Sequence, residues 1–501
     1  MSKFYITTPI YYVNDKPHIG HAYTTISADV LARYHRLKGE EVFFLTGTDE
    51  HGSKVAQSAR AAEMTPQEFC DLNAAKFQLL WDRLDITNDF FIRTTSQEHQ
   101  TRVKKFLEKL KDKGALYEGE YAGLYCTGCE KFITEKELVN GKCPDHNIEP
   151  EILKEKNYFF KLKEYLPEVE KLIDKGELKI LPQSRHKEVL GLIKQGLEDF
   201  SISRESVKWG IDLPFAKGQV VYVWVEALLN YITALGYGEA GDDFKKFWPA
   251  DVHLMAKDII KFHALYWPAL LLAAGEQPPK VIFAHGFFTV DGQKMSKTLG
   301  NTIDPDALID EFGSDAVRYL LLSQFPFGID GDVKAGNFAI QYNADLANGV
   351  GNLVSRVLAM TEKYFFGLVP KTQENELAEK TDIIWQEYEA AMENFGLDKA
   401  VETIKKLNSL ADGYIEKNQP WSLAKTDSEK LETIIYSLLE TIRQLAVMIY
   451  PLMPNTAEKI FSGLGLGDWK KLAFSELRAS RMLAPGTKVN KGEPLFPRLE
   501  K

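Results

Sequence analysis

The first fifty residues alternate between short apolar runs and one longer amphipathic segment. Lys3–Thr8 and Glu41–Leu45 are short and β-rich, whereas Ile19–Lys38 carries apolar residues at helical spacing. A polar turn ending at Pro17 separates the first run from the helix. A strand, a helix and a strand in this order are the unit of a parallel α/β sheet, so the pattern predicts such a sheet at the N-terminus.

Further along the chain the pattern changes twice. Residues 118–209 carry short polar turns and few long helical patterns, which indicates an insertion. Strand-like runs return at Val220–Trp224 and Val281–Ala284, so the sheet is expected to resume after the insertion. From residue 341 the chain is helix-like almost throughout, for example in Leu431–Ile449, which predicts a helical bundle.

Composition narrows the class of protein. A chain of 501 residues is too long for one core and indicates several domains. No run approaches the ~20 apolar residues of a membrane span, and the most apolar segment, Ala264–Ala274, is interrupted by Pro268 and predicts a buried helix. No targeting segment is evident, so we expect no membrane association and a cytoplasmic location. A net charge of −10 argues against bulk coating of nucleic acid but leaves a local RNA-binding face open.

The cysteines suggest a metal site. Three of the 4 cysteines cluster with one histidine in two short pairs, Cys126 with Cys129 and Cys143 with His146. Four such ligands satisfy tetrahedral Zn²⁺ and leave no open position, so we expect one structural zinc per chain. Cys70 stands apart and is expected to be a buried thiol.

Two short motifs carry candidate phosphate chemistry. His18 and His21 lie three residues apart on either side of Gly20, at the start of the first helix, where free N–H groups and the helix dipole favour phosphate. Lys294, Ser296 and Lys297 lie in a glycine-flanked loop, and two lysines three apart can stabilise charge on a departing pyrophosphate.

The two motifs together resemble the signature of class I aminoacyl-tRNA synthetases. The resemblance implies a Rossmann-type parallel-sheet catalytic domain, split by a zinc-knuckle insertion and followed by a helical anticodon-binding bundle. It also implies ATP bound with Mg²⁺, an aminoacyl adenylate intermediate, and Asp258 on the ribose of ATP. The expected divisions are 1–117 and 210–280 for the two catalytic halves, 118–209 for the insertion, 281–340 for the lysine loop and stem contacts, and 341–501 for the bundle.

Further segments resemble the methionine-specific family, over essentially the whole chain. They are Thr8–Asn14, Thr46–Gly52, Tyr222–Trp224 and Lys257–His263. The resemblance implies that the residue at Asp49 holds the ammonium group of methionine. It also implies a pocket lined by Ile10, Tyr12, Trp224, Ala227, Tyr231, Ile259 and His263, and flexible thioethers suit such aromatic walls.

Three positions depart from the family pattern. Ala256 stands where glycine commonly precedes Lys-Asp, Glu226 where aspartate is usual, and Thr298 where the lysine motif commonly ends in serine. The first departure leaves open how the ribose is accommodated.

The helical part carries a candidate RNA-reading surface. Asn352 and Arg356 are four apart on one helix face, and Trp421 follows Pro420 at a helix end. By the resemblance these three residues read the anticodon of the tRNA for methionine, initiator and elongator alike, and an exposed tryptophan suits stacking on an unpaired base.

Alternatives remain open at this point. The chain is also compatible with a class I synthetase for cysteine, valine, isoleucine or leucine, with a small-metabolite adenylyltransferase, or with a non-catalytic RNA-binding descendant of a synthetase. The chain ends directly after the bundle, which leads us to expect a monomer.

Overall fold

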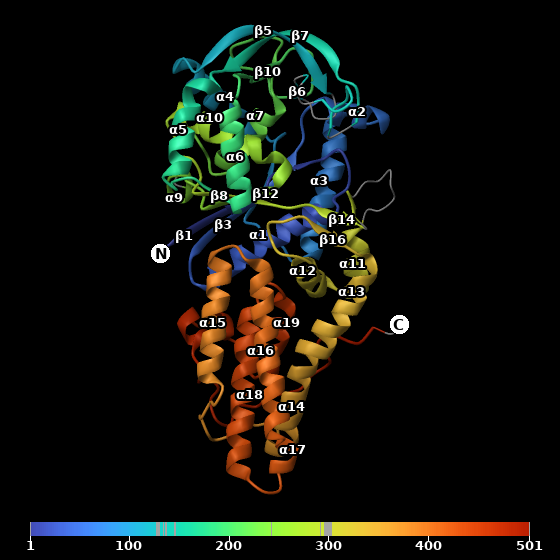
Figure 1. Ribbon diagram of the computed structural model, residues 1–501, viewed down its shortest axis with the longest axis vertical. Coiled ribbons are helices and arrows are strands. Elements are labelled where there is room, and N and C mark those ends of the chain that lie inside the picture. Colours follow the sequence, from blue (N-terminus) through green and yellow to red (C-terminus); the bar gives the residue numbers. More distant parts are fainter. Residues whose placement is uncertain are drawn as a thin grey trace.

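The computed structural model describes residues 2–499 except 127–130, 134, 136–137, 145–146, 242, 291 and 295–302. An α/β part and a helical bundle are stacked end to end along the long axis (Figure 1). Among the described helices, none is both long and apolar enough to cross a membrane.

A parallel sheet forms the centre of the α/β part. Its strand order is β2-β3-β1-β12-β13-β8, and β4 pairs with the C-terminal half of β3. The strands are β1 (Lys3–Thr7), β2 (Tyr11–Tyr12), β3 (Glu41–Asp49), β4 (Phe90–Arg93), β8 (Lys179–Leu181), β12 (Val252–Ala256) and β13 (Val281–His285). β1 and β12 lie side by side. β2 and β3, which follow β1 in the chain, lie on one side of this pair, and β13, which follows β12, lies on the other side. Ligands bind at such a switch point, beyond the carboxyl ends of the strands.

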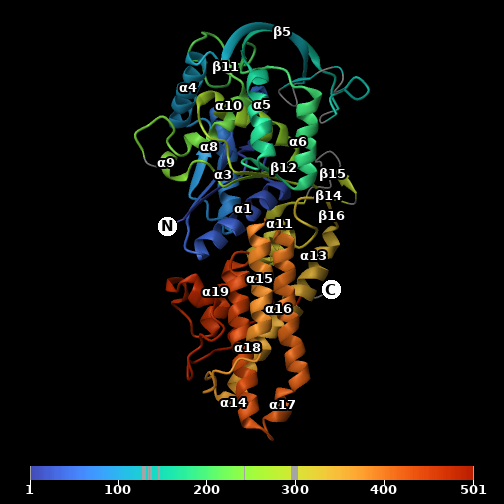
Figure 2. The same ribbon diagram turned by 60° about the vertical axis from the view of Figure 1, so that its left-hand side comes forward.

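Helices cover both faces of this sheet (Figure 2). α1 (Ile19–Leu37) packs on β1, β3 and β12, and every residue from Ala22 to His35 is buried. It is buried on all sides because α12 (Ser314–Leu322) covers the side that faces away from the sheet. The other helices of this part are α2 (Ser53–Ala61), α3 (Pro66–Arg83), α4 (Gln97–Asp112), α5 (Leu162–Asp174), α6 (Gln183–Gln195), α7 (Val223–Leu228), α8 (Asn230–Thr233), α9 (Asp243–Phe247), α10 (Trp267–Ala274) and α11 (Pro305–Phe312).

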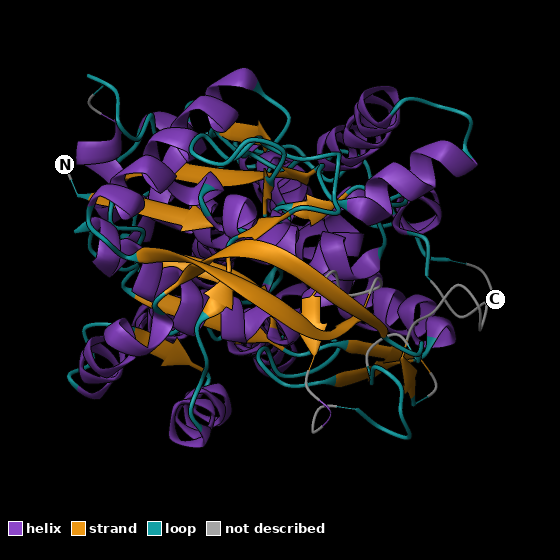
Figure 3. Cartoon of the chain, turned by 90° about the horizontal axis from the view of Figure 1, so that it is seen from above, coloured by secondary structure: helices purple, strands orange, loops and turns teal. Residues whose placement is uncertain are grey.

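A long antiparallel ribbon crosses the end of the sheet, as Figure 3 shows from above. It is formed by β5 (Leu116–Cys126) and β7 (Glu151–Phe160), flanked by β6 (Lys131–Ile133) and β9 (Phe200–Ser201). The range 118–209 thus contains this ribbon, but it also contains β8, which pairs with β13 in the main sheet. The chain returns to the sheet inside the segment that was expected to be an insertion.

Two local expectations need correction. Only Val220 and Val221 of the run Val220–Trp224 are strand (β11), and they pair with β10 (Ser203–Arg204) outside the main sheet. Val223–Leu228 is helix, and the strand that resumes the sheet is β12, which the pattern did not indicate. The helix expected from Ala264 is preceded by a π-helical turn and begins at Trp267.

The bundle has one almost wholly buried central helix. All residues of α18 (Ser428–Ile449) from Thr433 to Ile449 are buried, as expected for a helix surrounded by others. The other helices are α13 (Ala335–Gln341), α14 (Asn352–Phe365), α15 (Ala378–Glu393), α16 (Leu397–Asn418), α17 (Pro420–Leu423), α19 (Pro454–Gly463) and α20 (Phe474–Arg478). One apolar core continues from the sheet into the bundle, since Ile6, Val30 and Leu439 belong to the same cluster.

Candidate active site

The first sequence motif, with His18 and His21, lies after β2 at the start of α1. His18 is the N-cap of α1, and its Nδ1 accepts a hydrogen bond from the backbone N–H of Gly20 (3.1 Å). Nδ1 of His21 accepts from the backbone N–H of His18 (3.2 Å). Because each Nδ1 is an acceptor, each neutral ring carries its proton on Nε2 and can donate it to an anion. The start of α1 therefore offers two ring donors at the positive end of the helix dipole.

The two imidazoles are held against each other. Their centroids are 3.8 Å apart and their planes differ by 21°. Desolvation lowers the pKa of both rings, and proximity to His18 lowers the pKa of His21 further. A Cβ at Gly20 would lie 3.0 Å from Cε1 of His18, so the glycine lets the His18 ring fold over the first turn.

His285, at the end of β13, is a neighbour of this helix that sequence reasoning missed. Its Nδ1 donates to the carbonyl of Gly286 (2.7 Å), so its Nε2 accepts from the hydroxyl of Thr24 on α1 (2.7 Å). Burial lowers the pKa of His285 to about 4, partly offset by the bond to Gly286. The neutral ring ties the start of α1 to the end of β13.

The residues expected around methionine come partly from the strands of the main sheet and the segments that follow them, and partly from α7 and α8. In the pairing of β2 with β3, Tyr12 lies opposite Asp49. Asp49 is only 8% exposed and is followed by Glu50, which is fully buried and accepts from Nε (2.7 Å) and Nη2 (3.0 Å) of Arg93. Five of the expected pocket residues lie in or against one apolar cluster: Ile10, Tyr12, Trp224, Tyr231 and Ile259.

Tyr231 and His263 form a buried polar pair within that cluster. Nδ1 of His263 donates to the carbonyl of Ile259 (3.0 Å), which leaves Nε2 to accept from the hydroxyl of Tyr231 (2.7 Å). Burial lowers the pKa of His263 to about 4, so the ring is neutral near pH 7. In the same cluster, Trp224 stacks on Phe262 with centroids 4.3 Å apart, a partner that the sequence did not indicate.

A buried carboxylate, Glu226, connects three parts of the site. Its Oε1 lies 2.8 Å from Nδ1 of His51, and its Oε2 lies 3.0 Å from Nε2 of His99. Burial alone would raise the pKa of Glu226, but His51 and His99 bring it below its usual range, so both rings donate to an ionised carboxylate. The carbonyl of His51 accepts from the hydroxyl of Tyr12 (3.1 Å). Glu226 thereby links Tyr12 to the helix that carries Trp224 and Ala227.

Only some of the residues expected to bind ATP belong to the described part of the chain. Asp258 lies two residues after the end of β12, whose last residue, Ala256, pairs with His285 of β13. Ala256 has φ −77° and ψ 154°, a backbone conformation that does not need glycine. Lys294 lies in β15 (Gln293–Lys294), whose neighbour β14 (Phe288–Val290) pairs in turn with β16 (Gly331–Val333). Ser296, Lys297 and Thr298 lie outside the described residues.

Two of the four expected zinc ligands are described. Cys126 and Cys143 are buried at 0% and 1% exposure in a small cluster with Ile133, and neither forms a disulfide. Cys129 and His146 lie outside the described residues, and no cluster of three or more metal-ligating side chains occurs within the described part. Cys70 is buried as expected, with its thiol on the carbonyl of Glu50 (3.3 Å), and burial raises its pKa.

Comparison with known proteins decides the family. Residues 4–149 and 146–358 match the model of class I tRNA synthetases (M), and residues 367–501 match the anticodon-binding domain of methionyl tRNA ligase. The methionine–tRNA ligase of Caldanaerobacter subterraneus subsp. tengcongensis is 46% identical over 99% of the chain and 79% of its own length. That of Bacillus subtilis is 44% identical over 99% of the chain and 78% of its own length. The chain belongs to the methionyl-tRNA synthetase family.

Solved structures of the same family agree. Mycobacterium tuberculosis methionyl-tRNA synthetase in complex with methionyl-adenylate superimposes with a TM-score of 0.95, at 38% identity over 99% of this chain and 100% of that one. The expected fold, a Rossmann-type sheet followed by a helical anticodon-binding domain, is therefore confirmed.

Within this methionyl-tRNA synthetase fold, the expected anticodon residues lie on two helices of the bundle, α14 and α17. Nη2 of Arg356, on α14, is 2.8 Å from Glu416 and its Nη1 is 3.4 Å from Asp412, both on α16. Asn352 lies one turn before Arg356 and is exposed. Trp421 is 45% exposed on α17, at the end of the bundle far from the sheet (Figure 1).

Proposed function

We propose that this chain activates methionine with ATP at the carboxyl edge of the sheet and transfers it to tRNA. The observation that carries the proposal is the pairing of Tyr12 with Asp49 at the same edge as the start of α1. A buried carboxylate suited to an ammonium group, at the same edge as two ring donors suited to phosphate, supports this proposal. Methionine and ATP, the substrates expected from the family of the chain, carry the ammonium and phosphate groups that fit.

Methionine would lie among Ile10, Tyr12, Trp224, Ala227, Tyr231, Ile259 and His263, with its ammonium on Asp49. Aromatic rings suit the polarizable thioether. The Tyr231 hydroxyl is directed to His263, and the ring is neutral, so the lining presents no charge to the side chain. This supports a preference for an uncharged, flexible side chain.

The chemistry needs no nucleophile from the protein. A carboxylate oxygen of methionine attacks the α-phosphorus of ATP, the bond from that phosphorus to the bridging oxygen breaks, and pyrophosphate leaves. His18 and His21 would donate from Nε2 to phosphate oxygens, while Lys294, Ser296 and Lys297 would contact the departing pyrophosphate. Mg²⁺ bound with ATP would offset phosphate charge, and Asp258 would hold the ribose. A terminal ribose hydroxyl of tRNA then attacks the adenylate carbonyl and releases AMP.

The bundle would read the anticodon through Asn352, Arg356 and Trp421. Support comes from the exposure of Trp421 and from the acidic residues that orient Arg356. Exposed aromatic rings stack on unpaired bases without requiring a particular base, and neighbouring polar groups select among bases. The tRNA for methionine, initiator or elongator, is the expected partner.

We also propose a structural zinc on Cys126, Cys129, Cys143 and His146. Among the described residues, Cys126 and Cys143 are buried in a cluster with three further apolar residues, Ile133, Leu124 and Leu138. So small a core gains little from burial alone, and metal ligation is a common way to stabilise one. When bound, Zn²⁺ would hold the loop ends together and take no part in the reaction.

The cytoplasmic location and the monomeric state stay predictions. A light-scattering mass near 56.8 kDa would confirm a monomer, whereas a mass near twice that value would contradict it.

The deciding experiment is exchange of labelled pyrophosphate into ATP, with methionine compared with leucine, valine, isoleucine and cysteine. We expect exchange with methionine alone, and loss of exchange in Asp49→Ala and Lys297→Ala. Exchange with another amino acid would retain the reaction and overturn the pocket. No exchange with any amino acid would overturn the function.

A further inference from the structure

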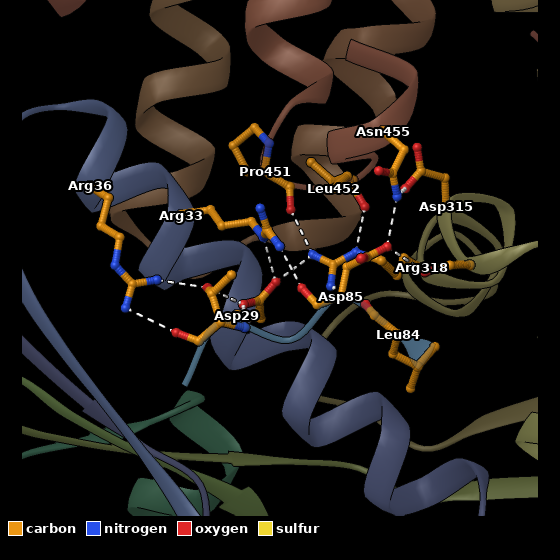
Figure 4. A network of polar contacts seen from close by, with 12 residues as sticks. Asp29, Arg33, Arg36, Leu84, Asp85, Asp315, Arg318, Pro451, Leu452 and Asn455 are labelled. Carbon is orange, nitrogen blue, oxygen red and sulfur yellow. Dashed lines mark hydrogen bonds and ion pairs between the residues drawn. The ribbon is translucent and has the colours of Figure 1, made fainter. Parts of the chain in front are cut away.

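Arg318 on α12 lies at the junction between the sheet and the bundle (Figure 4). Its side chain is fully buried. α12 packs against α1 on one side and against α16 and α19 on the other. A buried arginine in this place is costly unless its N–H groups are all matched, so its contacts indicate what it holds.

The guanidinium bonds to both sides of the junction. On the sheet side, Nη2 donates to Oδ2 of Asp29 on α1 (2.7 Å) and Nη1 donates to the carbonyl of Leu84 (3.0 Å). On the bundle side, Nε donates to the carbonyl of Leu452 (2.8 Å) and Nη2 donates to that of Pro451 (2.8 Å). Pro451 and Leu452 form the turn between α18 and α19. One planar group thus fixes the end of the central bundle helix against α1.

Asp29 is the matching acceptor on the sheet side. Its Oδ2 also accepts from Nε of Arg33 (2.7 Å), and its Oδ1 accepts from the N–H (2.7 Å) and hydroxyl (2.6 Å) of Thr87. Burial alone would raise the pKa of Asp29, but Arg318 and Arg33 hold it below its usual range. The carboxylate of Asp29 is therefore charged, and both of its oxygens accept hydrogen bonds. These bonds fix where the carboxylate meets the guanidinium of Arg318.

A second contact beside Arg318 fixes the start of α19. Oδ2 of Asp315, one turn earlier on α12, accepts from the backbone N–H of Thr456 in the first turn of α19 (2.5 Å). Nδ2 of Asn455 donates to Oδ2 of Asp85 (2.7 Å), next to Leu84. The junction is therefore a network of bonds, and Arg318 is its buried centre.

These bonds, together with the shared apolar core, join two functional regions. α1 begins with His18 and His21, and Asp29 lies on the same helix roughly 16 Å further along its axis. α18 runs from Ser428, just after α17 with Trp421, to the turn that Arg318 binds. At 1.5 Å per residue, its 22 residues span about 33 Å. A rotation of about 5° at the junction would therefore move the far end of the bundle by about 3 Å.

We propose that Arg318 is a positioning residue for the transfer step: it sets the angle between the helix that starts at His18 and the bundle, so that one tRNA reaches both ends. This inference rests on the proposed function. Adenylate formation uses only the sheet side of the junction and does not depend on this angle. Transfer to tRNA depends on it, because a misplacement of about 1 Å can cost about 100-fold in rate.

The test compares two activities of Arg318→Lys. Lysine retains the charge beside Asp29 but cannot span four acceptors as the planar guanidinium does. We expect methionine-dependent pyrophosphate exchange without tRNA to stay within about twofold, and kcat/KM for tRNA charging to fall at least about tenfold. A purely structural role would lower the two activities together.

Arg443→Lys is the matched control. Arg443 is also fully buried, bonds Glu440 through Nε (2.7 Å) and donates to the carbonyls of Leu477 and Ala479, all within the bundle. We expect it to leave the ratio of charging to exchange unchanged. An unchanged ratio in Arg318→Lys, or an equal fall in Arg443→Lys, would overturn the proposal.

Asn455→Ala is the second variant, since Asn455 is exposed and its loss should not prevent folding. We expect the ratio to fall about threefold, as a peripheral bond is lost. If Arg318→Lys does not fold, an unchanged ratio in Asn455→Ala overturns the inference. Absence of exchange in the unaltered protein would instead overturn the proposed function, so the two failures are distinguishable.

Discussion

The hydroxyl of Tyr231 donates to Nε2 of His263 across 2.7 Å, because the proton of this buried ring lies on Nδ1. The ring cannot turn its other nitrogen to Tyr231, because Nδ1 donates to the carbonyl of Ile259. The proposed methionine pocket is therefore bounded by a polar pair whose hydrogen-bonding groups satisfy each other.

Tyr231→Phe should weaken both the pocket and the fold. Nε2 of His263 would be left buried without a donor, at a cost of about 1–3 kcal/mol in the free energy of unfolding. We expect a lower urea midpoint together with a higher KM for methionine. Tyr388→Phe is the control, since its buried hydroxyl bonds the carbonyl of Met448 in the bundle and should affect the midpoint alone. A wild-type KM in Tyr231→Phe would contradict the proposed pocket.

Stability should fall as the pH falls from about 6.5 to about 4. Burial lowers the pKa of both His263 and His285 to about 4, so in this window the unfolded chain binds protons that the folded chain does not. The free energy of unfolding then rises with pH by up to about 1.4 kcal/mol per pH unit for each ring, and levels off above the ordinary value. Denaturant unfolding between pH 5 and pH 7 measures this slope. His285→Gln should reduce it, and an unchanged slope would show that this ring does not titrate as described.

Glu226→Gln should raise KM for methionine about tenfold with little change in kcat. An amide has one acceptor and so cannot accept from both His51 and His99, and His51 would lose the bond that orients the carbonyl on Tyr12. Steady-state pyrophosphate exchange separates the two constants. Glu440→Gln, another fully buried glutamate that lies in the bundle, should leave KM unchanged. An equal rise in both variants would indicate general destabilisation.

Purified protein should contain one zinc per chain by elemental analysis. Cys126→Ser and Cys143→Ser should lose it, because a hydroxyl is a poor ligand for Zn²⁺ compared with a thiolate. Cys70→Ser is the control, since Cys70 is buried against Glu50 and should not affect metal content. Protein without zinc that retains its thermal midpoint would overturn the proposed site.

Trp421→Ala should raise KM for tRNA and leave exchange without tRNA unchanged. Loss of one base stack costs about 1–3 kcal/mol, which corresponds to roughly 5- to 150-fold in affinity. Phe366→Ala offers a comparison, since Phe366 is 91% exposed in the same bundle but is not one of the anticodon residues. A comparable rise in KM with Phe366→Ala would contradict a specific role for Trp421.

Much of the sheet could be read from local pattern, and the exceptions have physical reasons. β1, β3 and β13 are apolar runs, so the pattern indicated them. β12 was missed because His253 interrupts it. That ring is held by hydrogen bonds with Thr7 (2.8 Å) and Trp267 (3.2 Å) and by stacking on Tyr231, all of them distant in sequence. A short apolar run such as Val220–Trp224 is buried as either strand or helix, so pattern alone could not choose between them.

The sequence by itself determined the chemistry of the candidate site. The histidine and lysine motifs and the cysteine pairs are contiguous, so their spacing and residue types are visible without the fold. Only the tertiary structure decided that Tyr231 donates to His263, that Glu226 bridges His51 and His99, and that Arg318 joins α1 to the bundle. These partners are distant in sequence, and a buried polar group is tolerated only where such partners satisfy it, so folding alone brings them together.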